Sequence, residues 1–370
     1  MAMPMHALAS LTRSSALIRP WRGGGGLGGG VVGRCFSAAP RKRDVALIRE
    51  LREASGAPMV DCKKALTAEG VDGDIAKAFE WLRKRGIAKA SAMADRSANE
   101  GVIGLRVDGR LGVLIEVNSE TDFVARNSKF QEFVGKAMGA ALELAGTGDA
   151  VTTDALGGGQ DLAFNVRALD LQQLLRTEPP GSEEALGDSL ADLVGSIREN
   201  ITVSRAQVMS MDEGSGLIEG YVHAAVGPGM GKNAALVALK FDSAAEAGEG
   251  VVDALRASAK SLSMHVVAAR PAFLDETVAP AQVLAKETKV YLQQAEESGK
   301  ERKFWDKMVE GRLMKYMQAN ALVRQPHVIA EGNPIVADVL TALGEEVGAA
   351  VTVEAFARLS VGERVISHTD

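Results

Sequence analysis

The sequence has few of the cysteines and histidines that form disulfides and metal sites. There are only two cysteines in 370 residues, so no disulfide framework and no cysteine-rich zinc site is expected. The five histidines show neither H-x₃-H nor H-E-x-x-H spacing and give no support for a zinc site either; they are His6, His223, His265, His327 and His368. A metal site is therefore not predicted.

Residue patterns typical of catalysis are also missing. No serine lies in a G-x-S-x-G motif, and the carboxylate pair Glu183–Glu184 lies in a polar stretch typical of solvated surface. Gly227–Asn233 looks like a phosphate loop, but Val226 and Asn233 stand where a Walker motif needs Gly and Ser or Thr, so a glycine-rich hairpin turn is predicted. His265, on an apolar helix face, is expected to be structural. The sequence predicts no catalytic residue, no bound cofactor and a binding protein instead of an enzyme.

Long apolar runs are absent, and acidic residues are absent near the N-terminus. No uncharged apolar run reaches the roughly 18 residues of a membrane span. No Asp or Glu precedes Asp44, whereas seven basic residues, four serines and the glycine-rich run Gly23–Gly30 do. This composition is typical of an organellar transit peptide, which we assign to residues 1–43, with cleavage after Phe36. We expect a location in the mitochondrial matrix, with the plastid as the alternative.

The chain beyond the transit peptide has no excess of positive charge. Subtracting the seven basic residues from the total of 42 leaves 35 against 48 acidic residues, a net charge of −13. Phosphate backbones attract clustered Lys and Arg, so direct binding of nucleic acid is not predicted.

Residues 44–87 have the pattern of three short helices separated by glycines. Apolar residues keep helical spacing within each segment, and the glycines at 56, 70 and 86 are expected to end the helices. So small a bundle is marginally stable alone, and it resembles a ubiquitin-associated (UBA) domain. Residues 88–99, rich in Ala, Lys and Ser, are expected to form a linker, either helical or mobile.

A unit rich in β-strand signals follows at residues 100–212. Val102–Val107 and Leu111–Val117 flank Asp108-Gly109, a strong hairpin signal. Further along, Ser128 and Gln131 have the spacing of a capping box. They precede a helix with an apolar face, made by Phe130, Phe133, Val134, Ala137, Met138 and Ala141. The rest of this unit is expected to be a helical insertion, with loops at Gly157–Gly159 and at Glu178–Gly181.

The same order of elements recurs in residues 213–277. Gly216–His223 and Ala234–Phe241 form a second strand pair, and a helix pattern extends from about Glu246 to Ala269. These repeats predict a pseudo-duplicated α+β core of two strand–strand–helix units. Residues 278–320 contain two charged helical stretches around Ser298–Lys300 and predict a protruding helical hairpin arm. Residues 321–370 return to the core with mixed strand and helix signals.

Aromatic residues make up only 4% of the chain, so a Phe in a polar segment needs an explanation. Phe123 lies in the segment Thr121–Asn127, between a strand pattern and a helix pattern. Loop positions contribute to function more often than core positions, because packing does not dictate them. The simplest structural alternative is that Phe123 folds back and covers the local core.

Four motifs together resemble the elongation factor Ts family. They are Leu51-Arg52-Glu53 with Gly56 and Met59–Leu66, the signature loop Val117–Ala125, Ser263–Ala269 with Pro271, and Lys307–Arg312. They occur in family order, from about Asp44 to beyond Gln325. Together with the transit peptide, the resemblance indicates an organellar member, most simply the mitochondrial form.

The resemblance implies guanine nucleotide exchange on elongation factor Tu, without bond chemistry. In family complexes the Asp–Phe pair of the signature loop enters the GTPase domain of Tu, and the Phe wedges between helices near the magnesium site. The N-terminal module and a histidine after the second hairpin's Tyr contact the same partner, and the arm resembles the family's coiled-coil protrusion. The residues that correspond to these contacts, with one further contact from the helix before Arg198, are Asp122, Phe123, Met59, Val60, His223 and Ile197.

Departures from the family pattern lie close to these residues. Ala224–Lys232 is longer and richer in glycine than the family's short turn, Arg198 stands where bacterial members often have Gly, and a terminal helix of bacterial relatives has no counterpart before Asp370. The sequence leaves open a homodimer and a 1:1 or 2:2 complex with Tu. The alternative function is a ubiquitin-like adapter that acts through residues 44–87, followed by an enzyme with weak GTP hydrolysis.

Overall fold

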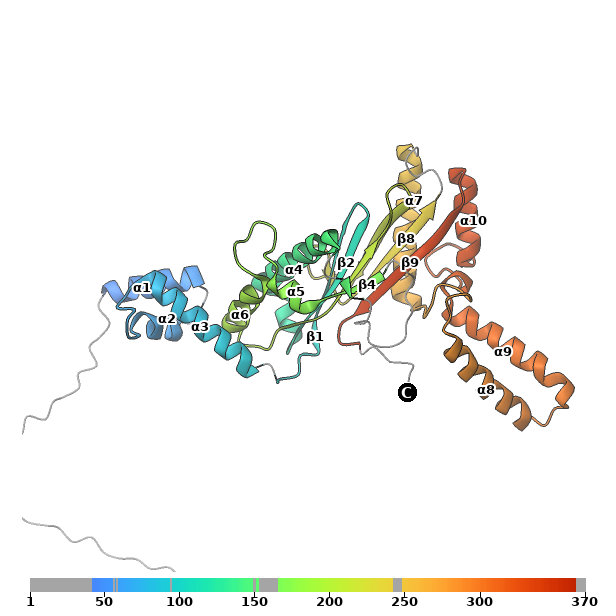
Figure 1. Cartoon of the computed structure of the whole chain (residues 1–370), viewed down its shortest axis with the longest axis horizontal. Coiled ribbons are helices and arrows are strands. Elements are labelled where there is room, and N and C mark those ends of the chain that lie inside the picture. Colours follow the sequence, from blue (N-terminus) through green and yellow to red (C-terminus); the bar gives the residue numbers. More distant parts are fainter. Residues whose placement is uncertain are drawn as a thin grey trace, which may run out of the picture.

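The computed structural model describes residues 42–55, 57, 59–93, 95–148, 151–152, 166–241 and 248–363. Residues 1–41 of the predicted transit peptide, its cleavage position and the Gly157–Gly159 loop lie outside these ranges. Within them the chain forms a mixture of helices and antiparallel sheets, as the α+β prediction requires (Figure 1). None of the described helices is both long enough and apolar enough to cross a bilayer.

The strands form two antiparallel sheets. One has the strand order β3-β4-β5-β2-β1-β7, and the other has the order β6-β8-β9. The bounds are β1 Glu100–Asp108, β2 Leu111–Ser119, β3 Val151–Thr152, β4 Val166–Leu169, β5 Thr202–Ser210, β6 Gly216–His223, β7 Met230–Gly231, β8 Asn233–Phe241 and β9 Val351–Ser360. Asp108 pairs with Leu111 across the predicted tight turn, and Gly109 there has a φ of 56°, which suits glycine. Both predicted hairpins are confirmed.

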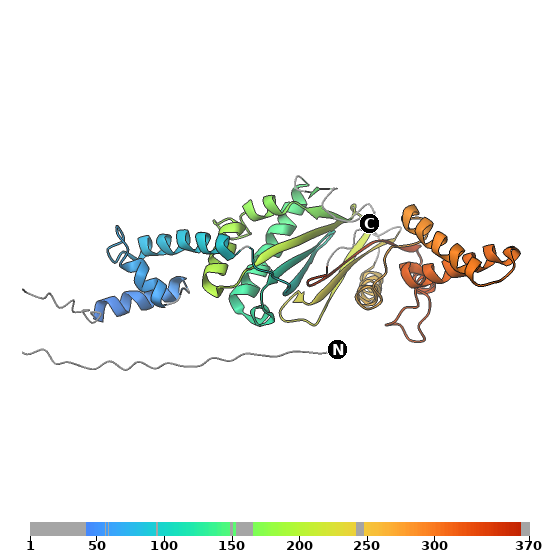
Figure 2. The ribbon, with the colours of Figure 1, turned by 90° about the horizontal axis from the view of Figure 1, so that it is seen from below.

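The two sheets pack against each other and each carries helices on its outer face (Figure 2). Successive side chains of a strand point to opposite faces, so Val102 packs toward helix α4 (Ser128–Thr147) while Ile103 packs toward the second sheet. On the second sheet, Val237 and Leu239 face helix α7 (Glu249–Ala269). Burial on both faces explains why these strands have nearly continuous apolar sequences.

The insertion of the first unit is less helical than predicted. It contains helices α5 (Leu171–Arg176) and α6 (Leu186–Ile197), but it also supplies β5, which pairs with β2 in the middle of the sheet. The prediction missed β5 because Arg205 and Gln207 interrupt its apolar pattern. Arg205 is neutralised by the buried carboxylate of Glu116, at 2.5 Å, so a basic residue is accommodated in a central strand.

The start of α4 differs from the predicted capping box. Asn127, not Ser128, is the N-cap, because its Oδ1 accepts hydrogen bonds from the backbone N–H of Lys129 and Phe130. Gln131 uses its side chain elsewhere. The predicted apolar face of this helix is confirmed, since all six of its residues are buried.

The N-terminal helices are α1 (Lys42–Ser55), α2 (Met59–Leu66) and α3 (Ile75–Met93). Helix α1 begins two residues inside the predicted transit peptide. Gly86 does not end α3, so the predicted linker at residues 88–99 begins as helix. The reason is that Gly86 is a contact point: a Cβ on Gly195 of α6 would lie 3.3 Å from the Gly86 Cα. The glycine permits close helix packing instead of stopping the helix.

The predicted arm is a pair of helices, α8 (Ala281–Glu297) and α9 (Trp305–Asn320), with Gly299 in the turn between them. The pair projects from the sheets at the end opposite α1–α3 (Figures 1 and 2). Helix α10 (Val336–Val347) then packs beside α7, and β9 completes the second sheet. Short 3₁₀ turns complete the described elements, at Asp122–Arg126, Arg302–Phe304 and Leu322–Arg324.

Candidate functional site: an exposed loop held on the core

The segment after β2 forms a single 3₁₀ turn, Asp122–Arg126, that presents one aromatic ring to solvent. The side chain of Phe123 is 82% exposed, whereas the next two residues, Val124 and Ala125, are buried. The alternative that Phe123 covers the local core is therefore wrong, because its two neighbours do that packing. Asp122 is exposed beside the ring.

The backbone of this loop is fixed at both ends. At its start, the backbone N–H and the hydroxyl of Thr121 donate to the two carboxylate oxygens of Glu199, at 2.9 and 2.7 Å. The Ser119 hydroxyl donates to the Thr121 carbonyl at 2.8 Å. At its end, the Asn127 N–H donates to the Val124 carbonyl, at 2.9 Å. Phe123 is thus an exposed side chain on an ordered backbone, so a partner that buries it need not first order the loop.

Gln131 joins this loop to the segment that follows His223. Its side-chain amide donates to the carbonyl of Ala125 at 3.0 Å and to the carbonyl of Val226 at 2.9 Å. The two acceptors lie in different halves of the chain, so one amide group holds two loops on the same surface. The sequence had marked Gln131 only as a capping residue.

The glycine-rich segment Ala224–Lys232 is part of the fold. Its β7 strand pairs with β1, and the Gly229 carbonyl accepts from the Leu105 N–H at 2.7 Å. Gly229 has a φ of 66°, and a Cβ there would lie 2.5 Å from the Leu105 carbonyl oxygen, so glycine is required. The segment connects strands and lies on the first sheet, which agrees with the predicted turn and not with a phosphate loop.

His223 is exposed at the end of β6, where its Nδ1 lies 3.2 Å from the Tyr221 hydroxyl. Ile197, the last residue of α6, is half-buried and packs against the core between the first sheet and α4. The structure therefore places His223 at the surface, three residues before Val226, which Gln131 links to the 121–127 loop. Much of Ile197, in contrast, faces inward.

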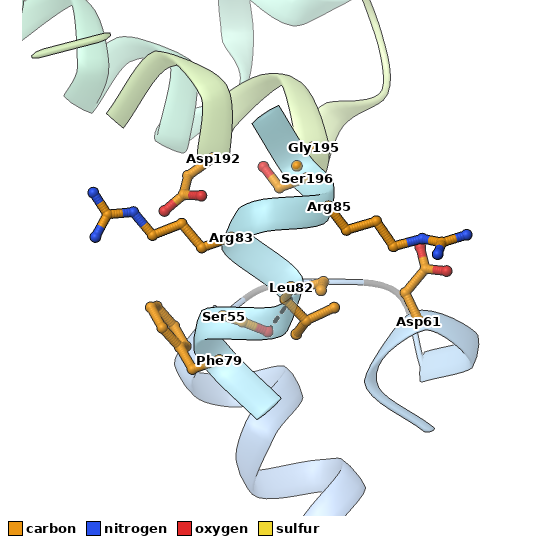
Figure 3. A pocket seen from close by; sticks show the side chains of 11 residues that line it. Ser55, Asp61, Phe79, Leu82, Arg83, Arg85, Asp192, Gly195 and Ser196 are labelled. Atoms are coloured by element: carbon orange, nitrogen blue, oxygen red, sulfur yellow. Dashed lines mark hydrogen bonds between the residues drawn. The ribbon is translucent and has the colours of Figure 1, made fainter. Parts of the chain in front are cut away.

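Met59 and Val60 lie on a separate element, at the exposed start of α2, with 57% and 63% of their surfaces accessible. Their module contacts the core where α3 crosses α6. Arg83 of α3 forms ion pairs with Glu184, at 3.3 Å, and with Asp188. A cavity of about 50 Å³ remains at this crossing, and Arg83 and Asp192 lie on the same side of it (Figure 3). Ion pairs between side chains of the module and of the core therefore make up much of the contact at this junction.

Two buried histidines lie away from these surfaces. His265 of α7 is fully buried, its Nε2 lies 3.0 Å from the Gln325 amide oxygen, and its Nδ1 accepts from the Val328 N–H. Burial lowers the pKa of His265 to about 4, and neighbouring His327 adds to the decrease, while the Gln325 hydrogen bond opposes it. The prediction of a structural His265 is confirmed.

The chain matches the family model described as Elongation factor TS over residues 120–363. It is 39% identical over 320 residues to an elongation factor Ts of Paramagnetospirillum magneticum, which covers 86% of this chain and 91% of the relative. A Sphingopyxis alaskensis elongation factor Ts is 37% identical, with 86% and 92% covered, and one of Rhodospirillum rubrum is 37% identical, with 86% and 93% covered. The chain belongs to the elongation factor Ts family.

Elongation factor Ts is a guanine nucleotide exchange factor of translation elongation, so membership favours exchange over the ubiquitin-adapter alternative and over bond chemistry. The sequence motifs pointed to Phe123 of this chain but missed the residues that anchor its loop, Glu199 and Gln131. Glu199 follows the predicted contact residue Ile197 by two positions, but its partner Thr121 is 78 residues away in sequence, and no local spacing signals such a pair.

Proposed function

We propose that this protein binds elongation factor Tu loaded with GDP and accelerates GDP release by inserting Phe123 near the magnesium and phosphate site of Tu. The observation that supports this proposal is the 82% exposed ring of Phe123 on a loop anchored by Glu199. Burial of that ring in a partner provides a hydrophobic contact that the free protein lacks. Asp122, beside it, contacts polar groups of the partner or fixes the loop in the complex.

Exchange needs no bond-making, only tighter binding to empty Tu than to loaded Tu. The coupling is reciprocal, so the factor weakens GDP as much as GDP weakens the factor. A thousandfold loosening of GDP corresponds to about 4 kcal/mol, whereas burying one Phe supplies roughly 1.5–3 kcal/mol. Phe123 is therefore one contribution among several, and we assign the remainder to Met59 and Val60, to His223 and, less directly, to Ile197.

The proposed division of labour follows the predicted domains. Residues 44–87, as a UBA-like module, and the two core units at 100–212 and 213–277 contact Tu. The arm at 278–320 acts as a coiled-coil protrusion, and residues 321–370 complete the core. No nucleic acid or cofactor takes part. The stoichiometry, 1:1 or 2:2 with Tu, is measured by light scattering of the purified complex.

We further propose that this is the mitochondrial form. The acid-free, Arg-rich residues 1–43 support import, and the bacterial relatives are compatible with an organelle of bacterial origin. A fusion of residues 1–43 to a fluorescent protein should localise to mitochondria, and N-terminal sequencing of the imported product should begin at Ser37. Plastid localisation would support the alternative compartment.

The direct test of the proposed function is release of a fluorescent GDP analogue from Tu in a stopped-flow instrument. Addition of residues 37–370 should accelerate release by orders of magnitude over the spontaneous rate. In parallel, the same protein immobilised on resin should retain Tu and not ubiquitin. Unchanged release together with retention of ubiquitin would overturn the proposal in favour of the adapter function.

A further inference from the structure

The turn between α6 and β5, Arg198–Asn200, reaches three separate parts of the molecule. The Arg198 guanidinium donates to the Asp61 carboxylate at 3.0 Å, and Asp61 is the residue that follows Met59 and Val60 in α2. The first residue of the turn, Arg198, thus contacts the N-terminal module. The next two, Glu199 and Asn200, contact the loop that presents Phe123.

Glu199 and Asn200 hold that loop. The Glu199 carboxylate accepts both hydrogen bonds from Thr121, immediately before Asp122 and Phe123. The backbone N–H of Asn200 donates to the Glu120 carboxylate at 2.7 Å, and its side-chain amide donates to the Arg96 carbonyl at 2.6 Å. The same short turn therefore anchors the loop from one side and the module from the other.

The backbone at Arg198 is unusual for a residue with a side chain. It is the C-cap of α6 with a φ of 68°, in the left-handed region that favours glycine. A non-glycine residue in this conformation destabilises the fold, and such residues persist where the surrounding structure requires them. Here the side chain supplies the contact with Asp61, which a glycine could not make.

The contact between Arg198 and Asp61 lies close to the junction between the N-terminal module and the core, where apolar packing is incomplete. Helices α3 and α6 meet at two glycines, Gly86 and Gly195, and the cavity of about 50 Å³ beside them shows that apolar packing there is incomplete. In Figure 3 the Arg85 side chain of α3 points to the same side of this pocket as Asp61, whose carboxylate Arg198 binds. Ion pairs contribute to the orientation of the module where apolar packing is incomplete.

We propose that Arg198 and Glu199 are positioning residues that hold Met59 and Val60 in a fixed relation to Phe123, so that both contacts engage one partner surface together. The proposal rests on the proposed exchange function. When either link is lost, each contact can still form but must be ordered during binding. The concentration of factor needed for half-maximal exchange should then rise, while the maximal rate at saturation changes little.

The experiment measures GDP release from Tu against the concentration of factor, together with the thermal midpoint of each variant. Arg198→Gly removes the Asp61 contact and relieves the left-handed strain. Its matched control is Arg270→Gly, because Arg270 is also an Arg C-cap, with a φ of 51°, at the end of α7. Glu199→Ala removes the Thr121 anchor, and Glu199→Gln restores it, since the amide can accept from the N–H and donate to the hydroxyl.

We expect the half-saturating concentration to rise about threefold in Arg198→Gly and about tenfold in Glu199→Ala. These values are in line with the loss of one partly buried ion pair and of a carboxylate that accepts two hydrogen bonds. Arg270→Gly and Glu199→Gln should stay near wild type, and the thermal midpoint of Arg198→Gly should not fall. A role in stability alone predicts that activity follows the thermal midpoint, and that outcome overturns the proposal, as does an unchanged half-saturating concentration. If the wild-type protein does not accelerate GDP release, the proposed exchange function is refuted. If the wild-type protein is active but Arg198→Gly and Glu199→Ala have the same half-saturating concentration as wild type, only the positioning role is refuted.

Discussion

The loop at 121–127 and the arm formed by α8 and α9 both expose apolar side chains, but they differ in how the backbone is held. Phe123 is exposed on a loop fixed by Glu199 and Gln131 from distant segments. On the arm, Phe304 lies in the 3₁₀ turn just before α9 and Met314 lies on α9, and they are 47% and 59% exposed. Near the tip of the arm the chain makes local contacts, such as the hydrogen bond from the Trp305 indole N–H to the Lys300 carbonyl at 2.9 Å.

This difference teaches that exposure alone does not define a contact site. A ring on a pre-ordered backbone can be buried by a partner without the added entropic cost of ordering the loop, whereas a ring on a projecting hairpin is positioned only as well as the hairpin itself. The loop is therefore the better candidate for a wedge, and the arm for a surface whose orientation can adapt.

The largest effect that would sharpen the contrast is expected from Gln131→Ala. It removes hydrogen bonds to two carbonyls, at Ala125 and Val226, and leaves them partly buried without that donor. Unfolding free energy should fall by about 1–3 kcal/mol, measured by urea denaturation. On the arm, Arg312→Ala removes a solvent-exposed hydrogen bond to Gln294. This substitution should change the free energy of unfolding by less than about 0.5 kcal/mol. Equal losses in the two variants would remove the distinction between loop and arm.

A smaller, pH-dependent effect is expected at the base of the arm, where His265 contacts Gln325 just after α9. The folded pKa of about 4 lies below the ordinary value of 6.5, so the unfolded state binds more protons between these values. The contribution of His265 is present above pH 6.5 and is lost as pH falls toward 4. Thermal midpoints from pH 7.5 to 4.5 should decline less in His265→Gln, compared at equal ionic strength, and parallel declines in the two proteins would refute this assignment.

The smallest effect is expected from Phe304→Ala on the arm. Its ring is half-exposed and lies 5.0 Å from the Lys303 ammonium, a contact of limited strength at an exposed site. The thermal midpoint should change by about 1 °C or less, and the rate of GDP release should match wild type. A rate lowered as strongly as by a change in the 121–127 loop would assign the arm an equal share in exchange.

The sequence predicted the parts of the fold in which apolar periodicity is unbroken. Both hairpins, α4, α7 and the arm follow from local patterns, and the loop with Phe123 followed from motif resemblance. Strand β5 escaped because Arg205 is paired with Glu116 across the sheet, so its polarity is hidden in the fold. Gly86 was interpreted as a stop because a close crossing with Gly195 looks, in sequence, like any other glycine.

The anchors of the candidate site were beyond sequence reasoning for a related reason. Thr121 and Glu199 are 78 residues apart, and Arg198 and Asp61 are 137 apart. Local spacing reports on neighbours within a helix or strand, whereas these pairs depend on how α6 is placed against the sheet and against α3. Only the folded chain brings them together.

The most direct test of the central claim compares Phe123→Ala with wild type in the stopped-flow release of a fluorescent GDP analogue from Tu, with Phe304→Ala as the matched control. Because the ring is 82% exposed, its removal should leave the thermal midpoint unchanged within about 1 °C. The account predicts that exchange stimulated by Phe123→Ala falls by at least about tenfold, in line with the loss of one buried Phe contact. Stimulation equal to that of wild type, in a variant of normal stability, would contradict it.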